Sequence, residues 1–193
     1  LQRLLGTASG RHLHDLAWGL DPRPVVPGHV EKSIGAETTF AVDLREAGAV
    51  EVHLLGLADR CARQLRSRAR LARTISLKVR TSGWRTVTRS RTLVAPTDVA
   101  REVYLVSREL FAGLDLQGEA VRLVGVRLEG LVELADRQPT LEESVGGEPA
   151  QRRAEQAMDE VRSRFGSASV GPATTLLPSP PRSTTAHPRG DLS

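Results

Sequence analysis

The stretch from Leu71 to Leu93, LARTISLKVRTSGWRTVTRSRTL, has the pattern of two β-strands joined by a tight turn. In its first half apolar residues alternate with polar or charged ones, which is typical of a strand with one buried and one exposed face. Thr81-Ser82-Gly83 supplies turn chemistry, and the residues from Trp84 onward are rich in types that favour a return strand. We therefore predict a β-hairpin whose exposed face carries Arg, Lys, Ser and Thr.

The hairpin lies within a strongly basic segment. Between Arg60 and Arg91 there are eleven arginines and lysines and no acidic residue, although the whole chain has a net charge of only +4. Charge segregated in this way is either a solvated face without a ligand or the footprint of a polyanion. Because guanidinium groups mixed with hydroxyls on a rigid sheet suit phosphate oxygens, the pattern favours nucleic acid.

The composition of the chain limits the class of protein to which it can belong. With 193 residues, 39% of them hydrophobic, it can bury one core of about 100 residues with attached segments. The single cysteine, Cys61, shares an apolar helix stripe with Leu54, Leu57 and Leu65, so we predict a core residue rather than a nucleophile. No apolar run approaches the ~20 residues of a membrane span, and no signal peptide is evident. These features favour a reducing, intracellular setting.

The elements around the hairpin predict the order β-α-β-β-α-β. A first strand is expected over Lys32–Phe40 and an amphipathic helix over Glu51–Arg68. After the hairpin a second helix begins with Thr97 as its N-cap, and a last strand covers Val121–Leu131. The fold class is therefore α+β: a two-layer domain, residues 32–131, in which a four-stranded sheet has two helices on one face.

The residues before this domain have a different composition. Residues 1–20 predict a short helical segment that resembles the end of an upstream domain. Residues 21–31 are rich in proline and glycine and predict a linker. Since the chain begins at Leu1 and has its only methionine at position 158, we expect a missing N-terminal part.

The residues after the domain, 132–193, predict a largely disordered, flexible tail. A short amphipathic helix is expected near 150–165, with an apolar stripe formed by Ala154, Met158, Val161 and Phe165. Because no core stripe of the sheet domain requires this tail, its removal after Gly146 should leave the domain folded.

The sheet face that the helices leave uncovered is the candidate binding surface. By alternation it carries small, hydroxyl and basic residues: Ser33, Gly35, Thr74, Ser76, Lys78, Gly125 and Arg127. A glycine on such a face leaves the backbone open to close approach by a ligand.

The return strand does not alternate simply. If Val87 faces the core, Arg89 and Arg91 do too, which desolvation opposes. Either a bulge intervenes, or Thr86, Thr88 and Ser90 form the exposed face beside inclined arginines. Trp84, at the turn, can stack on a base, but packing against the hairpin is the preferred interpretation.

Four short motifs in this order resemble the thumb end and little-finger domain of Y-family DNA polymerases, of the actinobacterial DNA polymerase IV type. They are GLDPRPV at 19–25, KSIG at 32–35, RSRTL at 89–93 and RLVGVR at 122–127. The resemblance covers residues 1–131. It identifies residues 1–20 as the end of the thumb domain and residues 32–131 as the little finger.

The resemblance implies a DNA-gripping part of an error-prone translesion DNA polymerase, a nucleotidyltransferase of DNA repair. The uncovered sheet would lie in the major groove of the template–primer duplex and hold its phosphate backbone. The residues then expected to contact DNA are Lys32, Ser33, Gly35, Thr74, Ser76, Lys78, Arg85, Thr88, Arg89, Ser90, Arg91 and Arg127.

The resemblance also implies partners and cofactors. The parent protein would be a monomeric, cytoplasmic bacterial enzyme without a membrane partner, whose catalytic carboxylates and Mg²⁺ lie in a palm domain upstream of Leu1. No cofactor or metal is expected in the present residues, which alone should be inactive. Gln138 and Leu141 fit a sliding-clamp peptide, although Pro139 and Glu142 replace the hydrophobic residues that would fill the clamp pocket.

Two other functions stay open at this point. One is a non-catalytic Y-family-like adaptor that lacks the palm carboxylates. The other is an RNA-binding α/β module of similar element order, although neither central strand shows the aromatic pattern that stacks bases in such modules.

Overall fold

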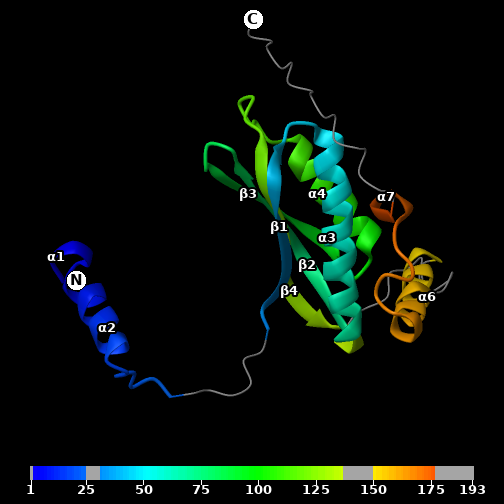
Figure 1. Ribbon diagram of the computed structural model, residues 1–193. Helices are drawn as coiled ribbons and strands as arrows, with labels where there is room; N and C mark the ends of the chain where they lie inside the picture. Colours follow the sequence, from blue (N-terminus) through cyan, green and yellow to red (C-terminus); the bar gives the residue numbers. More distant parts are fainter. Residues whose placement is uncertain (1, 25–30, 137–149, 177–193) are drawn as a thin grey trace, which may run out of the picture. The chain divides into compact units, whose positions relative to one another are not determined.

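The computed structural model describes residues 2–24, 31–136 and 150–176 (Figure 1). The chain divides into two compact units, Leu1–Glu31 and Lys32–Ser193. The first unit contains two short helices, α1 (Gln2–Leu5) and α2 (Thr7–Ala17), on either side of Gly6. Leucine side chains of both helices are exposed.

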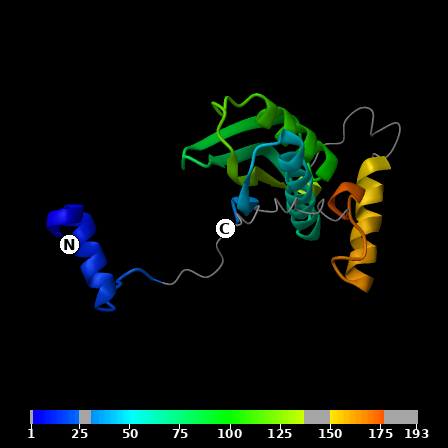
Figure 2. The same ribbon diagram turned by 45° about the horizontal axis from the view of Figure 1, so that its top comes forward.

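The second unit has the predicted element order. Its strands and helices are β1 (Ser33–Leu44), α3 (Ala47–Ser67), β2 (Arg70–Thr81), β3 (Thr86–Thr97), α4 (Ala100–Ala112), β4 (Val121–Glu133), η1 (Leu134–Asp136), α6 (Ala150–Phe165) and α7 (Ala173–Leu176). The four strands form one sheet in the order β1-β4-β2-β3, and all neighbouring strands are antiparallel (Figure 2). The fold is therefore α+β, as the sequence indicates.

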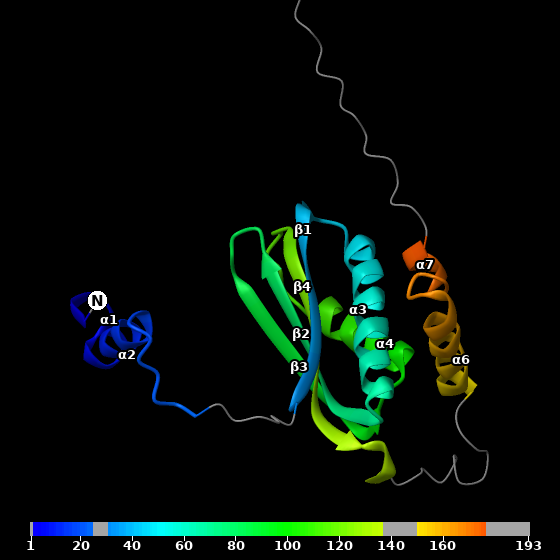
Figure 3. The same cartoon turned by 60° about the horizontal axis from the view of Figure 1, so that its bottom comes forward.

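Helices α3 and α4 cover one face of the sheet, and the hydrophobic core lies between these layers (Figure 3). Leu54 and Leu65 of α3 pack in this core with Ile75 and Leu128 of the sheet, and all four are fully buried. Cys61 lies among them, and burial raises the pKa of its thiol to about 11. The prediction that Cys61 is a core residue is confirmed.

Helix α4 begins later than the sequence predicts. Its N-cap is Val99, and the Thr97 hydroxyl accepts a hydrogen bond from the Val99 amide at 3.0 Å. The first amides of α4 instead donate to the carboxylate of Glu155 in α6, at 2.7 Å from Ala100 and 3.2 Å from Arg101. A side chain from a distant helix thus supplies the cap that we assigned to Thr97.

The predicted helix near 150–165 exists as α6, but the prediction of its buried face was wrong. Its buried residues are Arg152, Glu155 and Arg162, whereas Val161 and Phe165 of the expected apolar stripe are exposed. Figure 3 shows α6 outside the helical layer, on the side away from the sheet. The helix packs against the domain through charged side chains, because the surface beneath it carries groups of opposite charge.

These groups come from α3 and from the residue before the N-cap of α4. Arg152 pairs with Asp98 at 2.7 Å, Glu155 with Arg66 at 2.6 Å, and Arg162 with Asp59 at 3.0 Å. Arg66 also donates to Asp159 at 2.7 Å. The part of residues 132–193 that contains α6 is therefore joined to the domain by a buried network of ion pairs, which we call the α6 dock.

The register of β3 shows on which side of the sheet the side chains of the return strand lie. Arg89 is paired with Leu77 and Arg91 with Ile75, so both arginines lie on the helix-facing side of the sheet. They remain exposed because β3 is an edge strand, where the helical layer does not bury them. The argument that desolvation keeps Arg89 and Arg91 off this side of the sheet was therefore wrong for an edge strand. The register shift lies further along, between the pairs Thr92–Thr74 and Thr97–Ala72.

Candidate nucleic-acid interface

The uncovered side of the sheet, here called the open face, is organised in four rungs that each cross all four strands. In the strand order β1, β4, β2, β3 the rungs are Ser33–Glu129–Thr74–Thr92, Gly35–Arg127–Ser76–Ser90, Glu37–Gly125–Lys78–Thr88 and Thr39–Leu123–Arg80–Thr86. Residues paired across neighbouring strands point to the same face, so these side chains share one surface.

The first two rungs hold a hydrogen-bonded network around Arg127. Its Nε and Nη2 donate to the hydroxyl of Ser33 at 3.1 and 2.9 Å, and its Nε lies 3.5 Å from Glu129. The Ser76 hydroxyl donates to the same Glu129 carboxylate at 2.7 Å. Arg127 is thereby positioned while its side chain stays 62% exposed, which leaves donors available to an anion.

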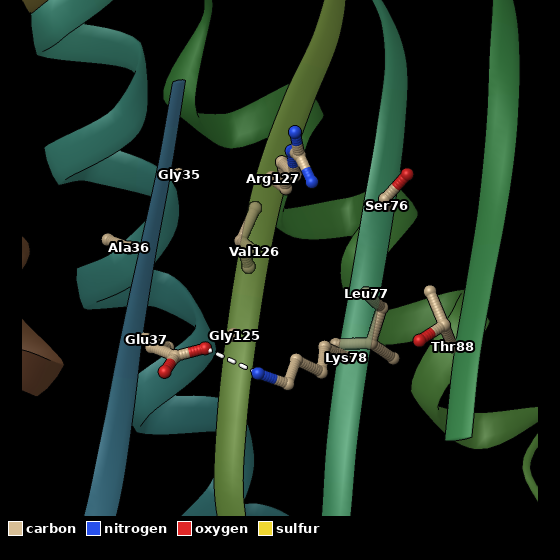
Figure 4. Close-up of a pocket in the computed structure, with 10 residues that line it drawn as sticks. All are labelled: Gly35, Ala36, Glu37, Ser76, Leu77, Lys78, Thr88, Gly125, Val126 and Arg127. Atoms are coloured by element: carbon tan, nitrogen blue, oxygen red, sulfur yellow. Dashed lines mark hydrogen bonds and ion pairs between the residues drawn. The ribbon is translucent and has the colours of Figure 1, made fainter. Parts of the chain in front are cut away.

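The third rung lies in a shallow hollow, about 350 Å³ in volume, in the middle of the open face (Figure 4). Lys78 of β2 donates to Glu37 of β1 at 2.9 Å, and this ion pair passes above Gly125 of β4. A Cβ at position 125 would lie 2.9 Å from the Cβ of Glu37, which is too close. Glycine at 125 therefore allows the ion pair to cross the central strand.

The open face differs from our expectation in its charge. Arg127, Lys78 and Arg80 share it with two carboxylates, Glu37 and Glu129, so its net charge is only slightly positive. The sequence pattern places Glu37 on the polar side of its strand, but it does not show that Glu37 meets Lys78 across an intervening strand. Both acidic residues limit the attraction of this face for phosphates.

The structure brings together eight of the twelve residues expected to contact DNA. The open face contains Ser33, Gly35, Thr74, Ser76, Lys78, Thr88, Ser90 and Arg127. Lys32 is exposed directly before β1. Ser76 is buried and its hydroxyl donates to Glu129, so it helps to position this carboxylate and is not available to a ligand.

The other three arginines lie elsewhere. Arg89 and Arg91 project from β3 on the helix-facing side; Arg91 pairs with Glu109 of α4, while Arg89 donates to the Thr88 carbonyl at 3.0 Å. Arg85 belongs to the turn after β2, where it lies 3.5 Å from Glu119. The clamp-peptide residues Gln138 and Leu141 lie outside the described residues.

Among the described residues, no group of three or more His, Cys, Asp or Glu side chains is placed to hold a metal ion. Within the described parts of the chain, no helix is both long and apolar enough to cross a membrane.

Known proteins resemble this chain in sequence and in fold. Residues 31–141 match the sequence model of the impB/mucB/samB family C-terminal domain. The DNA polymerase IV of Desulfatibacillum aliphaticivorans is 36% identical over 179 residues, which are 91% of this chain and 45% of that protein. The DNA polymerase IV of Streptomyces coelicolor is 39% identical over 160 residues, 83% of this chain and 32% of that protein.

The chain thus spans less than half the length of these curated relatives. A solved Y-family DNA polymerase chimera matches with a TM-score of 0.50 and 17% identity, over 68% of this chain and 38% of that chain, which shows a shared fold. The resemblance drawn from the four motifs is confirmed. The chain belongs to the impB/mucB/samB family, and it corresponds to the C-terminal part of a Y-family DNA polymerase of the DNA polymerase IV type.

Proposed function

We propose that this chain is the DNA-gripping part of an error-prone translesion polymerase and holds the template–primer duplex by its phosphate backbone. The observation that carries the proposal is the open face itself. Arg127 and Lys78 are positioned over a floor that contains Gly35 and Gly125, on a sheet whose other side is covered by helices. A rigid surface of this kind orders little on binding, so it supports a grip without large rearrangement.

The side chains of the open face favour phosphate over base recognition. The four rungs contain hydroxyls, three cations and two glycines, and none of their residues is aromatic. Contacts to phosphates position a protein on DNA but carry no sequence information. That property suits a polymerase, which has to move along every sequence.

The edge strand β3 extends the basic surface beyond the open face. Thr88 and Ser90 belong to the open face, while Arg89 and Arg91 lie on the opposite side of the same strand. Within the described residues, no carboxylate lies at ion-pair distance from Arg89. We propose that a phosphate strand running along this edge meets hydroxyls from one side and guanidinium groups from the other.

Nucleotidyl transfer is proposed for the parent protein, on the basis of the relatives named DNA polymerase IV. That reaction needs paired carboxylates holding Mg²⁺. Asp98, an acidic residue of the present chain, is committed to Arg152 in the α6 dock. We therefore propose that this chain grips DNA and that the palm of the parent protein carries out nucleotidyl transfer. We place the parent protein in the bacterial cytoplasm. Clamp binding through Gln138 and Leu141 stays a prediction.

The experiment measures duplex binding by the 193-residue chain at several salt concentrations. Lys78→Ala with Arg127→Ala should weaken binding equally for unrelated sequences and reduce the salt slope by roughly two, about one for each lost phosphate contact. The matched control is Arg60→Ala with Arg101→Ala, which removes the same charge from exposed positions of α3 and α4. An equal loss in both variants, or a loss confined to one sequence, would contradict a grip by the open face.

A further inference from the structure

Trp84 occupies the tip of the turn between β2 and β3, and its side chain is 65% exposed. The sequence favours packing against the hairpin, and the ring does lie near Arg80 of β2, but most of the residue stays exposed to solvent. Two cations lie near the ring. The guanidinium carbon of Arg122 is 4.6 Å from the ring centroid, and that of Arg80 is 5.9 Å away.

The backbone does not explain a tryptophan at this position either. Trp84 has a φ of +66°, in the left-handed region that favours glycine or asparagine and is unfavourable for bulky residues. The turn is closed by hydrogen bonds from the Trp84 amide to the Thr81 carbonyl and from the Thr81 amide to the Arg85 carbonyl. A glycine would satisfy the same geometry with less strain.

Hydrogen bonds from neighbouring residues hold the backbone of the turn in a fixed place. The Ser82 amide donates to the Ala120 carbonyl at 2.8 Å, and the Gly83 amide donates to Glu119 at 3.1 Å. Arg122 is also oriented, because it lies 3.6 Å from Asp43. The structure therefore presents an exposed aromatic side chain on a fixed turn, and neither the core nor the turn requires it.

We propose that Trp84, with Arg80 and Arg122, is a stacking platform for an unpaired base of single-stranded DNA next to the duplex. This inference rests on the proposed function, since Arg80 belongs to the fourth rung of the open face and makes the two surfaces continuous. Bases in a duplex already stack on one another, so only an unpaired base offers its ring to the tryptophan. Aromatic stacking tolerates every base, and the two guanidinium groups favour the flanking phosphates.

The test uses the two tryptophans of the chain, Trp18 and Trp84. In a Trp18→Phe background, Trp84 is the only tryptophan and reports its own contacts by fluorescence. A duplex with a single-stranded extension should quench this fluorescence, and a blunt duplex with the same paired length should not. Trp84→Ala should weaken binding of the extended duplex about ten-fold and leave binding of the blunt duplex unchanged.

Trp84→Gly separates stacking from a structural role. Because glycine accepts the left-handed conformation, this variant should keep or raise the Tm and still lose the preference for the extended duplex. Equal binding of the extended duplex by the parent chain and by Trp84→Ala overturns the platform, even where both bind DNA. A lower Tm for Trp84→Gly with equal losses on both duplexes assigns Trp84 to the turn instead. Failure of the parent chain to bind either duplex overturns the proposed function and this inference together.

Discussion

The open face and the α6 dock are built from the same kinds of ion pair and differ in their access to water. On the open face, the side chains of Lys78 and Glu37 are 38% and 54% exposed. In the α6 dock, those of Arg152 and Asp98 are 9% and 2% exposed. Exposed pairs contribute about 0–1 kcal/mol and are screened by salt, whereas removing one partner of a buried pair costs roughly 3–5 kcal/mol.

Because of this difference in exposure, the ion pairs of the open face and those of the α6 dock have different roles. Lys78 can exchange Glu37 for a phosphate at little cost, because water already screens the pair and remains free to solvate Glu37. In the α6 dock the partners have no such alternative while the helix is in place, so the pairs act as structure. Exposure, rather than residue type, separates the surface that can bind from the surface that supports.

The largest effect is expected from deleting residues 147–193, which removes α6. The deletion should lower the free energy of unfolding by about 3–5 kcal/mol, because α4 loses the Glu155 acceptor and the dock is dismantled. Urea denaturation measures this loss. The sheet and its core should still form. An unchanged stability would restore the expectation drawn from the sequence and show that the α6 dock contributes nothing.

A smaller loss is expected from Glu155→Ala. It removes the carboxylate that accepts from the Ala100 amide and pairs with Arg66. Its cost cannot exceed that of the deletion, because α6 can leave its site and expose the remaining charges to water; we expect about 2–4 kcal/mol by urea denaturation. Glu155→Gln, which keeps an acceptor oxygen, should recover part of the loss.

The control for this variant is Glu109→Ala, which removes the exposed carboxylate partner of Arg91. It should change the free energy of unfolding by less than about 1 kcal/mol. If Glu109→Ala and Glu155→Ala destabilise the chain equally, burial does not distinguish the two classes of ion pair.

The smallest effect on stability is expected from Glu37→Gln on the open face. The free energy of unfolding should change by less than about 1 kcal/mol, since the pair with Lys78 is exposed. Duplex affinity should rise about three-fold, because one carboxylate no longer faces the phosphates and Lys78 is released to them. Weaker duplex binding by Glu37→Gln would show that Glu37 itself contacts the ligand or holds Lys78 in its binding position.

The sequence predicts the order of elements and most of the open face because both depend on local patterns. Alternation along β1 and β2 places Ser33, Gly35 and Lys78 correctly, since a residue's face is set by its neighbours in the same strand. Arg89 and Arg91 could not be placed in this way. Their exposure depends on β3 being at the sheet edge, which is a property of the whole topology.

The buried face of α6 was unpredictable for a related reason. Helical periodicity finds the apolar stripe, but Arg162 pairs with Asp59, which is 103 residues away along the chain. No local pattern shows that a helix will bury its charged side. Glu129 is different, because the alternation that places Gly125 and Arg127 on the open face also places Glu129 there. Its hydrogen bond from Ser76 crosses to another strand, so a local pattern does not show that contact.

The central claim is that duplex DNA lies on the open face and the β3 edge. Its most direct test is the amide chemical-shift change of the ¹⁵N-labelled chain on addition of a blunt duplex. We predict changes along the four rungs and at Arg89 and Arg91, with none on the outward surface of α3 around Arg60. Changes concentrated on α3 and α4, with the four rungs unaffected, would contradict the account.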